Sequence, residues 1–233
     1  MIHSLETDYE RAERDALVAF ARPGDVLFDV GAYVGWYSVD FAKRVPESMV
    51  YAFEPISENR KELVLNTAIY NNIVTYPVGL SNHGGFVNFY VSGKESGTAS
   101  MSQLEEERFG TTMVTSHLVT TLDTHCARRT GPSFIKIDVE GAELLVLQGA
   151  IETLSQHRPI VLCEMLRKWS ARFSYHPNDI IAFMAGLDYR CQTVDGRPFE
   201  LMTNETIERN FFFLPTSTGE GRRQSILKKS TIG

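Results

Sequence analysis

The chain has 233 residues, 43% hydrophobic and 22% charged, which suits one sizeable core and is short for two ordinary domains. Its formal net charge of −6 argues against nucleic acid as the main partner, because phosphate binding depends on clustered lysine and arginine. No apolar run approaches the roughly 20 residues that span a bilayer, and residues 1–15 lack a signal-peptide core, so no membrane partner is expected. The three cysteines form no disulfide or zinc pattern, which favours a cytoplasmic protein.

Short apolar runs alternate with helical patterns along most of the chain. An N-terminal helical segment, residues 1–24, is expected to end at Pro23-Gly24. Strands are then predicted at 26–30, 49–54, 73–78, 134–139, 160–165, 189–194 and 211–214. Helices are predicted between them at 35–45, 57–71, 142–155 and 178–186. This alternation is typical of βαβ units around a parallel sheet, with residues 1–215 forming one domain.

Three stretches fall outside that alternation. "FVNFYV", residues 86–91, predicts an extra strand after a glycine turn. The polar residues 92–115 that follow are expected to form a mobile loop or lid. Residues 216–233 are rich in Ser, Thr, Gly, Arg and Lys with little to bury, so a disordered tail is expected there.

The stretch "VLFDVGAYVGWYS" carries the first functional signal. A buried strand runs into Asp29, Gly31 and Gly35, a D-x-G-x-x-x-G pattern where a dinucleotide site has G-x-G-x-x-G. A carboxylate at this place would repel a pyrophosphate and would suit the sulfonium and ammonium groups of S-adenosylmethionine. The sequence therefore predicts that cofactor, with an NAD-dependent oxidoreductase on a similar sheet as the alternative. A helix-capping role for Asp29 also stays open.

Two later strand ends extend the predicted cofactor site. Glu54, in "YAFEP", follows Gly31 by about the separation that places an acid on ribose hydroxyls in nucleotide-binding folds. The third strand ends at "YPVGLSN", which would place Gly79, Leu80 and Ser81 beside the adenine. A solvated acid at Glu54 and an ordinary turn at 79–81 are the structural alternatives.

The stretch "FIKIDVEGAELLVLQGA" carries the predicted chemistry. In a doubly wound sheet this strand lies beside the first one, so Asp138 would lie close to the transferable methyl group. Asp138 is therefore the first candidate for the general base or hydroxyl-orienting group, and Glu140 is the second. Glu164 ends the next strand, in "VLCEM", and could face the same cleft.

Two other roles for these acids remain open at this stage. Asp138 and Glu164 could together hold Mg²⁺, which would lower the pKa of a bound hydroxyl, although nothing in their spacing demands a metal. The acids after the strand, Glu143 among them, could instead cap the following helix or pair with Lys136 and Arg167.

Taken together, these motifs resemble the FkbM family of S-adenosylmethionine-dependent methyltransferases. The resemblance rests on "VLFDVGAYVGWYS", "VYAFEP", "VGLSN", "TTLD" and "FIKIDVEGAELLVLQGA" and runs from about residue 26 to 165. It implies an α/β, Rossmann-like class I methyltransferase fold with a seven-stranded, mostly parallel sheet, helices on both faces and an antiparallel last strand, which "RNFFFLP" fits. It also implies O-methylation of hydroxyls on small molecules such as sugars or secondary metabolites.

The resemblance also implies roles for particular residues. Cofactor-site positions match Asp29, Gly31, Gly35, Glu54 and Gly79, and their neighbours Ala32 and Pro55 are assigned to the same site. Asp138 and Glu140 match the acids of the reaction cleft, with Asp138 also near the cofactor. A cofactor-binding regulatory protein without turnover and a nucleic-acid methyltransferase are the remaining alternatives. The acidic balance and the lack of an N-P-P-Y-like tetrapeptide disfavour the second of these.

Overall fold

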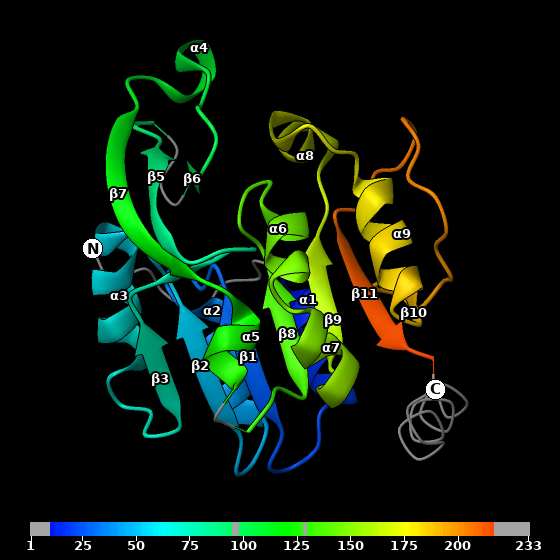
Figure 1. The fold of residues 1–233 in the computed structure, drawn as a ribbon. Helices are drawn as coiled ribbons and strands as arrows, with labels where there is room; N and C mark the ends of the chain where they lie inside the picture. The colour runs from blue at the N-terminus through cyan, green and yellow to red at the C-terminus, as the bar shows by residue number, and fades with distance from the viewer. Residues whose placement is uncertain (1–9, 95–97, 128–129, 217–233) are drawn as a thin grey trace.

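The computed structural model describes residues 10–94, 98–127 and 130–216. Within those ranges the chain forms a seven-stranded sheet with helices on both faces and a second, smaller sheet above one edge of it (Figure 1). Residues 1–9 of the predicted N-terminal helical segment and residues 217–233 of the predicted tail lie outside the described residues. Among the described helices, none is both long enough and apolar enough to cross a bilayer.

The large sheet has the predicted topology. Its strands run in the order β10-β11-β9-β8-β1-β2-β3, so β8 lies beside β1 as expected. Strand β11 is antiparallel to both neighbours and the other pairings are parallel, which confirms the Rossmann-like class I arrangement. The strands are β1 Val26–Val30, β2 Met49–Phe53, β3 Ile73–Tyr76, β8 Phe134–Ile137, β9 Ile160–Glu164, β10 Tyr189–Thr193 and β11 Asn210–Pro215.

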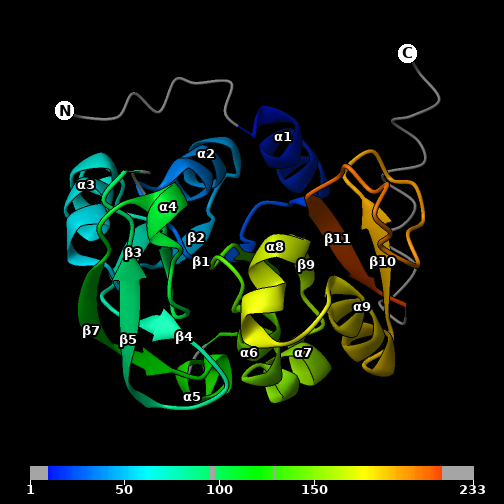
Figure 2. The same ribbon diagram turned by 90° about the horizontal axis from the view of Figure 1, so that it is seen from above.

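Helices cover both faces of this sheet (Figure 2). One face carries α1 Arg11–Phe20, α2 Trp36–Arg44 and α3 Ser57–Thr67, and the other carries α5 Leu122–Cys126, α6 Glu143–Gln148, α7 Ile151–His157 and α9 Pro177–Gly186. Two apolar cores follow, one around Phe41 and one around Val146. Because both faces are covered, a central strand such as β1 reads as a continuous buried run.

The predicted helix 142–155 is wrong in one respect, because it is broken into α6 and α7. A Cβ on Gly149 would overlap the carbonyl oxygen of Ser81, so the chain passes another backbone too closely for any larger residue. Asp123 then caps the new helix, since its Oδ1 accepts from the backbone N–H of Thr153 at 2.8 Å. The helix therefore breaks because the chain at Gly149 packs against residues 79–81 and the "TTLD" segment caps the helix that follows.

Helix α3 is also shorter than predicted. It ends at Thr67 rather than at residue 71, and the N–H of Tyr70 then donates to the carbonyl of Thr67 at 2.9 Å. This turn redirects the chain into β3, which runs parallel to β2.

The second sheet contains the predicted extra strand. Its order is β4-β7-β5-β6, with β4 Gly79–Leu80, β5 Gly85–Val91, β6 Ala99–Ser100 and β7 Met113–Thr120. Within the predicted loop or lid at 92–115, the described residues form β6, α4 Glu106–Phe109 and the start of β7. Figure 1 shows this sheet and α4 rising above the large sheet. Closure over a substrate stays a prediction.

Side chains join the second sheet to the segment after β9, which forms α8 Arg167–Ser170 and the 3₁₀ turn Ala171–Phe173. The Arg172 guanidinium donates to the carbonyl of Gln103 at 2.8 Å and lies 4.8 Å from the Trp169 ring centre. The rings of Trp169 and Phe109 are 5.5 Å apart, centre to centre. The two segments therefore meet above the end of the large sheet.

Candidate active site

A cavity of about 380 Å³ lies where β1, β2 and β8 end, beneath the second sheet. The strand ends supply one side of its wall, and β5 and β6 supply the other. The wall residues are Gly31, Tyr33, Trp36, Glu54, Pro55, Ile56, Asn59, Phe89, Thr98, Ala99, Asp138, Val139 and Glu140. The carboxyl ends of parallel strands are the usual ligand-binding edge of such sheets.

Gly31 lets two of these strand ends meet. Its φ is +75°, and a Cβ there would overlap the carbonyl oxygen of Asp138. Its N–H donates to the carbonyl of Phe53 at 3.1 Å, which fixes the turn against the end of β2. Only glycine allows this approach, so the first motif and the Asp138 motif are joined through one position.

Glu54 has a carboxylate held by backbone donors. The N–H of Tyr33, which has φ 51°, donates to Oε2 at 3.0 Å, and the N–H of Ile56 donates to Oε1 at 2.9 Å. Burial raises the pKa of Glu54 to about 7, opposed by these hydrogen bonds. An ionised carboxylate has about four acceptor sites, so this group can still accept hydroxyl donors from the cavity.

Lys136 is a cation in the middle of the buried strand β8, and its contacts explain its position. Its Nζ lies 3.7 Å from Asp29 Oδ1 and 3.5 Å from Asp138 Oδ2, and it donates to the carbonyl of Gly31 at 3.1 Å. Ser38 donates to the other Asp29 oxygen at 2.6 Å. Burial raises the pKa of Asp29, while Lys136 and Ser38 act to lower it. Asp29 is fully buried and lies below the cavity wall rather than in it.

The loop after β8 is held by Glu143. Its Oε1 accepts from the N–H groups of Val139 and Gly141 at 3.2 and 3.0 Å, and Oε2 accepts from the Tyr175 hydroxyl at 3.1 Å. Within this loop Glu140 has φ 54°, a conformation that a non-glycine residue adopts only when its surroundings fix it. Glu143 therefore has the structural role that the sequence left open, and it does not line the cavity.

Glu164 lies outside the cavity wall. It borders a second hollow, of about 540 Å³, together with Glu10 and Asn210. Burial, followed by repulsion from Asp138 and Glu140, raises the pKa of Glu164 to about 10, so its carboxyl group is protonated at neutral pH. In the described ranges, no group of three or more His, Cys, Asp or Glu side chains has an arrangement that could hold a metal ion. The structure thus gives the predicted Mg²⁺ pair no support.

The predicted site residues divide into two sets. Gly31, Glu54, Pro55, Asp138 and Glu140 line the cavity, whereas Asp29, Ala32, Gly35, Gly79, Leu80, Ser81 and Glu164 do not. Ala32 packs against Ala52 and Leu63, and Gly35 begins α2 with φ +94°. Gly79 and Leu80 form β4, and Ser81 is fully buried. Their contact with a cofactor stays a prediction.

Several wall residues were not predicted. Asn59 could have been predicted from the sequence, because it lies in the first turn of the helix that follows Glu54. Phe89 could have been predicted because the residues of β5 alternate between two sides of the strand. No sequence pattern predicts Thr98 and Ala99, because only the pairing of β6 with β5 brings them over the cavity.

Comparison with known proteins gives one family and a shared fold. The model of the methyltransferase FkbM domain matches residues 29–191. The crystal structure of methyltransferase FkbM from Methylobacillus flagellatus KT superposes with a TM-score of 0.53 at 17% identity, covering 83% of this chain and 44% of that one. A TehB-like SAM-dependent methyltransferase from Corynebacterium glutamicum gives a TM-score of 0.50 at 10% identity, covering 88% of this chain and 86% of that one. At these identities both structures share the fold with this chain.

A sequence relative covers a shorter stretch. AMB antimetabolite synthetase AmbE from Pseudomonas aeruginosa is 37% identical over 70 residues, which are 30% of this chain and 3% of that protein. This chain therefore spans only a small part of that relative and less than half of the Methylobacillus protein.

Proposed function

Because this chain belongs to the FkbM methyltransferase family, we propose that it transfers a methyl group from S-adenosylmethionine to a hydroxyl oxygen of a small molecule. The observation that carries the proposal is a single cavity with Glu54 in one part of its wall and Asp138 in another. The first carboxylate suits ribose hydroxyls, and the second suits the reacting hydroxyl.

The cavity fits the proposed cofactor. The charged residues in the described part of its wall are the acids Glu54, Asp138 and Glu140, a set that suits a sulfonium nucleoside and disfavours a pyrophosphate. Glu54 would hold the ribose, and the Gly31 turn would lie along the methionine part. Bound there, S-adenosylmethionine supplies an electrophilic methyl group. The TehB-like neighbour is described as SAM-dependent, which agrees with this assignment.

The protein's own part in the reaction is alignment and proton removal. We assign to Asp138 the proton that the acceptor hydroxyl loses as its oxygen bonds to the methyl carbon. The ammonium of Lys136 lies 3.5 Å from Oδ2 and holds this carboxyl group at the end of β8. Glu143 acts through the loop, since it fixes Val139 and Gly141 on either side of Glu140.

The same cavity supports the proposed acceptor class. A volume of about 380 Å³ that must also hold a nucleoside suits a small hydroxylated molecule, such as a sugar or a secondary metabolite, better than nucleic acid. The antimetabolite synthetase among the relatives is in keeping with small-molecule chemistry, over its 70 matched residues. A cytoplasmic location stays a prediction; the three buried free thiols support it.

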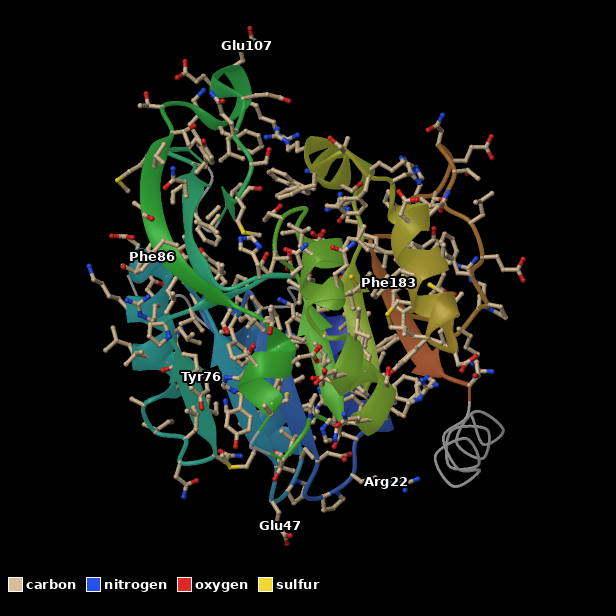
Figure 3. The ribbon with its side chains drawn as sticks, viewed as in Figure 1. Arg22, Glu47, Tyr76, Phe86, Glu107 and Phe183 are labelled. Atoms are coloured by element: carbon tan, nitrogen blue, oxygen red, sulfur yellow. The ribbon has the colours of Figure 1, made fainter. Side chains whose placement is uncertain are left out.

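Titration calorimetry with S-adenosylmethionine, S-adenosylhomocysteine and NAD tests the cofactor. Micromolar binding of the first two and none of NAD is expected, and the reverse would refute the proposal. A panel of hydroxylated acceptors, followed by the mass gain of one methyl group with and without EDTA, tests the reaction. Asp138→Ala should abolish transfer and leave S-adenosylhomocysteine affinity within a few-fold, while Glu47→Gln, at the opposite edge of the sheet, serves as the control (Figure 3).

A further inference from the structure

The charges around the cavity are unbalanced. Among the residues that the structure describes, three acids line the cavity, and none of its thirteen wall residues is a lysine or arginine. More acids lie directly behind the wall and interact electrostatically with Asp138, namely Glu10, Asp29, Glu143 and Glu164. Glu10 directly precedes α1, and the other three come from β1, α6 and β9, so carboxyl groups approach Asp138 from several elements.

Lys136 is a cation in contact with this group, and the contacts of its ammonium are made within the protein. Its Nζ meets the carbonyl of Gly31, the carboxylates of Asp29 and Asp138, and the ring of Tyr37 at 5.1 Å. Lys136 is only 6% exposed and does not line the cavity. One buried ammonium therefore faces several carboxyl groups, and the low-dielectric walls strengthen their effect inside the cavity.

We propose that this site selects by charge between methyl donor and product, binding cationic S-adenosylmethionine more tightly than neutral S-adenosylhomocysteine. The inference rests on the proposed function and adds to it that the product is a weak inhibitor. The two molecules differ only in one methyl group and the positive charge on sulfur. Carboxylates near the sulfur therefore stabilise the donor and have no net charge to attract in the product.

The state of Glu164 supports the same inference. Burial first, and then repulsion from Asp138, Glu140, Glu143 and Glu10, raises the pKa of Glu164 to about 10, so the group keeps a proton. A cation entering beside Asp138 weakens that repulsion. The donor should consequently release more protons on binding than the product does.

Calorimetry of the full chain with three ligands tests the inference without an acceptor. The third ligand is sinefungin, which carries an amine in place of the methylated sulfur and so offers a positive charge without a sulfonium. S-adenosylmethionine and sinefungin should each bind at least about tenfold more tightly than S-adenosylhomocysteine, a difference of about 1.4 kcal/mol. Repeating the titrations in buffers of different ionisation enthalpy counts the protons released by each ligand.

Matched variants then locate the charge. Asp138→Asn and Glu140→Gln should weaken the two cationic ligands by about fivefold or more and leave the product within about twofold. Glu47→Gln should change none of the three affinities, because it is exposed at the opposite edge of the large sheet (Figure 3). Circular dichroism checks that each variant is folded, and the comparison uses whichever of the two variants keeps its fold.

The possible results separate the two proposals. If none of the three nucleosides binds, the proposed function fails. If all bind and the product binds as tightly as the donor, the inference on charge is overturned and the function stands. It is also overturned if the Asn and Gln variants weaken all three ligands equally, since the acids would then act on the structure of the site alone.

Discussion

The contact between Gly31 and the backbone of Asp138 predicts a large effect for Gly31→Ala. At φ +75° an alanine costs about 1–2 kcal/mol relative to glycine, partly offset by a less flexible unfolded chain. Its Cβ would also overlap the carbonyl oxygen of Asp138 and lie 3.0 Å from the carbonyl carbon. Overpacking of this kind adds about 1–3 kcal/mol, because strands β1 and β8 must separate. We expect a total loss of about 3 kcal/mol.

Gly24→Ala is the matched control. Its φ of +84° is similar, but a Cβ there meets nothing within 4 Å, so only the conformational cost of about 1 kcal/mol applies. Equilibrium unfolding in urea measures both variants, and with a slope of about 2 kcal/mol per M the midpoint should fall about 1 M further for Gly31→Ala. S-adenosylmethionine affinity should fall for Gly31→Ala only. Equal midpoints for the two variants would refute the role given to the close contact.

Four further effects are expected. If ribose hydroxyls donate to the ionised form of Glu54 as proposed, cofactor affinity should rise as pH increases towards the pKa of about 7 and then level off. Calorimetry of Glu54→Gln should show weaker binding without this rise. The ionised carboxyl is the form that burial penalises, so the contribution of Glu54 to stability should decrease as pH rises from about 4.5 to 7. Lys136→Met should lower the free energy of unfolding in urea by about 3–5 kcal/mol, because it leaves Asp29 buried without its cation. The double variant with Asp29→Asn should regain more than half of this lost stability. No recovery would contradict the pairing of Lys136 with Asp29. Arg172→Ala should speed amide hydrogen exchange in residues 99–112 and lower the free energy of global unfolding by less than about 1 kcal/mol. Unchanged exchange would mean that Arg172 does not fix the second sheet to the segment after β9.

The large sheet was predictable because its signals are local. Continuous apolar strands, glycine turns and an acid at each strand end place Gly31, Glu54 and Asp138 at one edge without knowledge of any distant contact. The break at Gly149 was missed because its cause is the backbone of Ser81, 68 residues away.

The second sheet was predictable only in part for a similar reason. The alternating side chains of β5 predict a strand from the sequence alone. Strand β6 has two residues and forms only through its pairing with β5, so the sequence does not predict it. Glu164 was placed in the reaction cleft because it ends a strand, yet its side chain borders a different hollow. Strand position gives the edge of the sheet to which a residue belongs and does not give the direction of its side chain.

The pairing of β4 with β7 makes the second sheet an exchangeable module. Gly79 pairs with Val119 and Leu80 with Thr120, and the N–H of Ser81 donates to the carbonyl of Thr120 at 3.0 Å. The chain thus leaves the main body and re-enters it at adjacent points, so a segment of different length can join the same two ends at little entropic cost. Since this segment supplies part of the cavity wall, new acceptor preferences could arise by replacing it while the large sheet keeps its sequence.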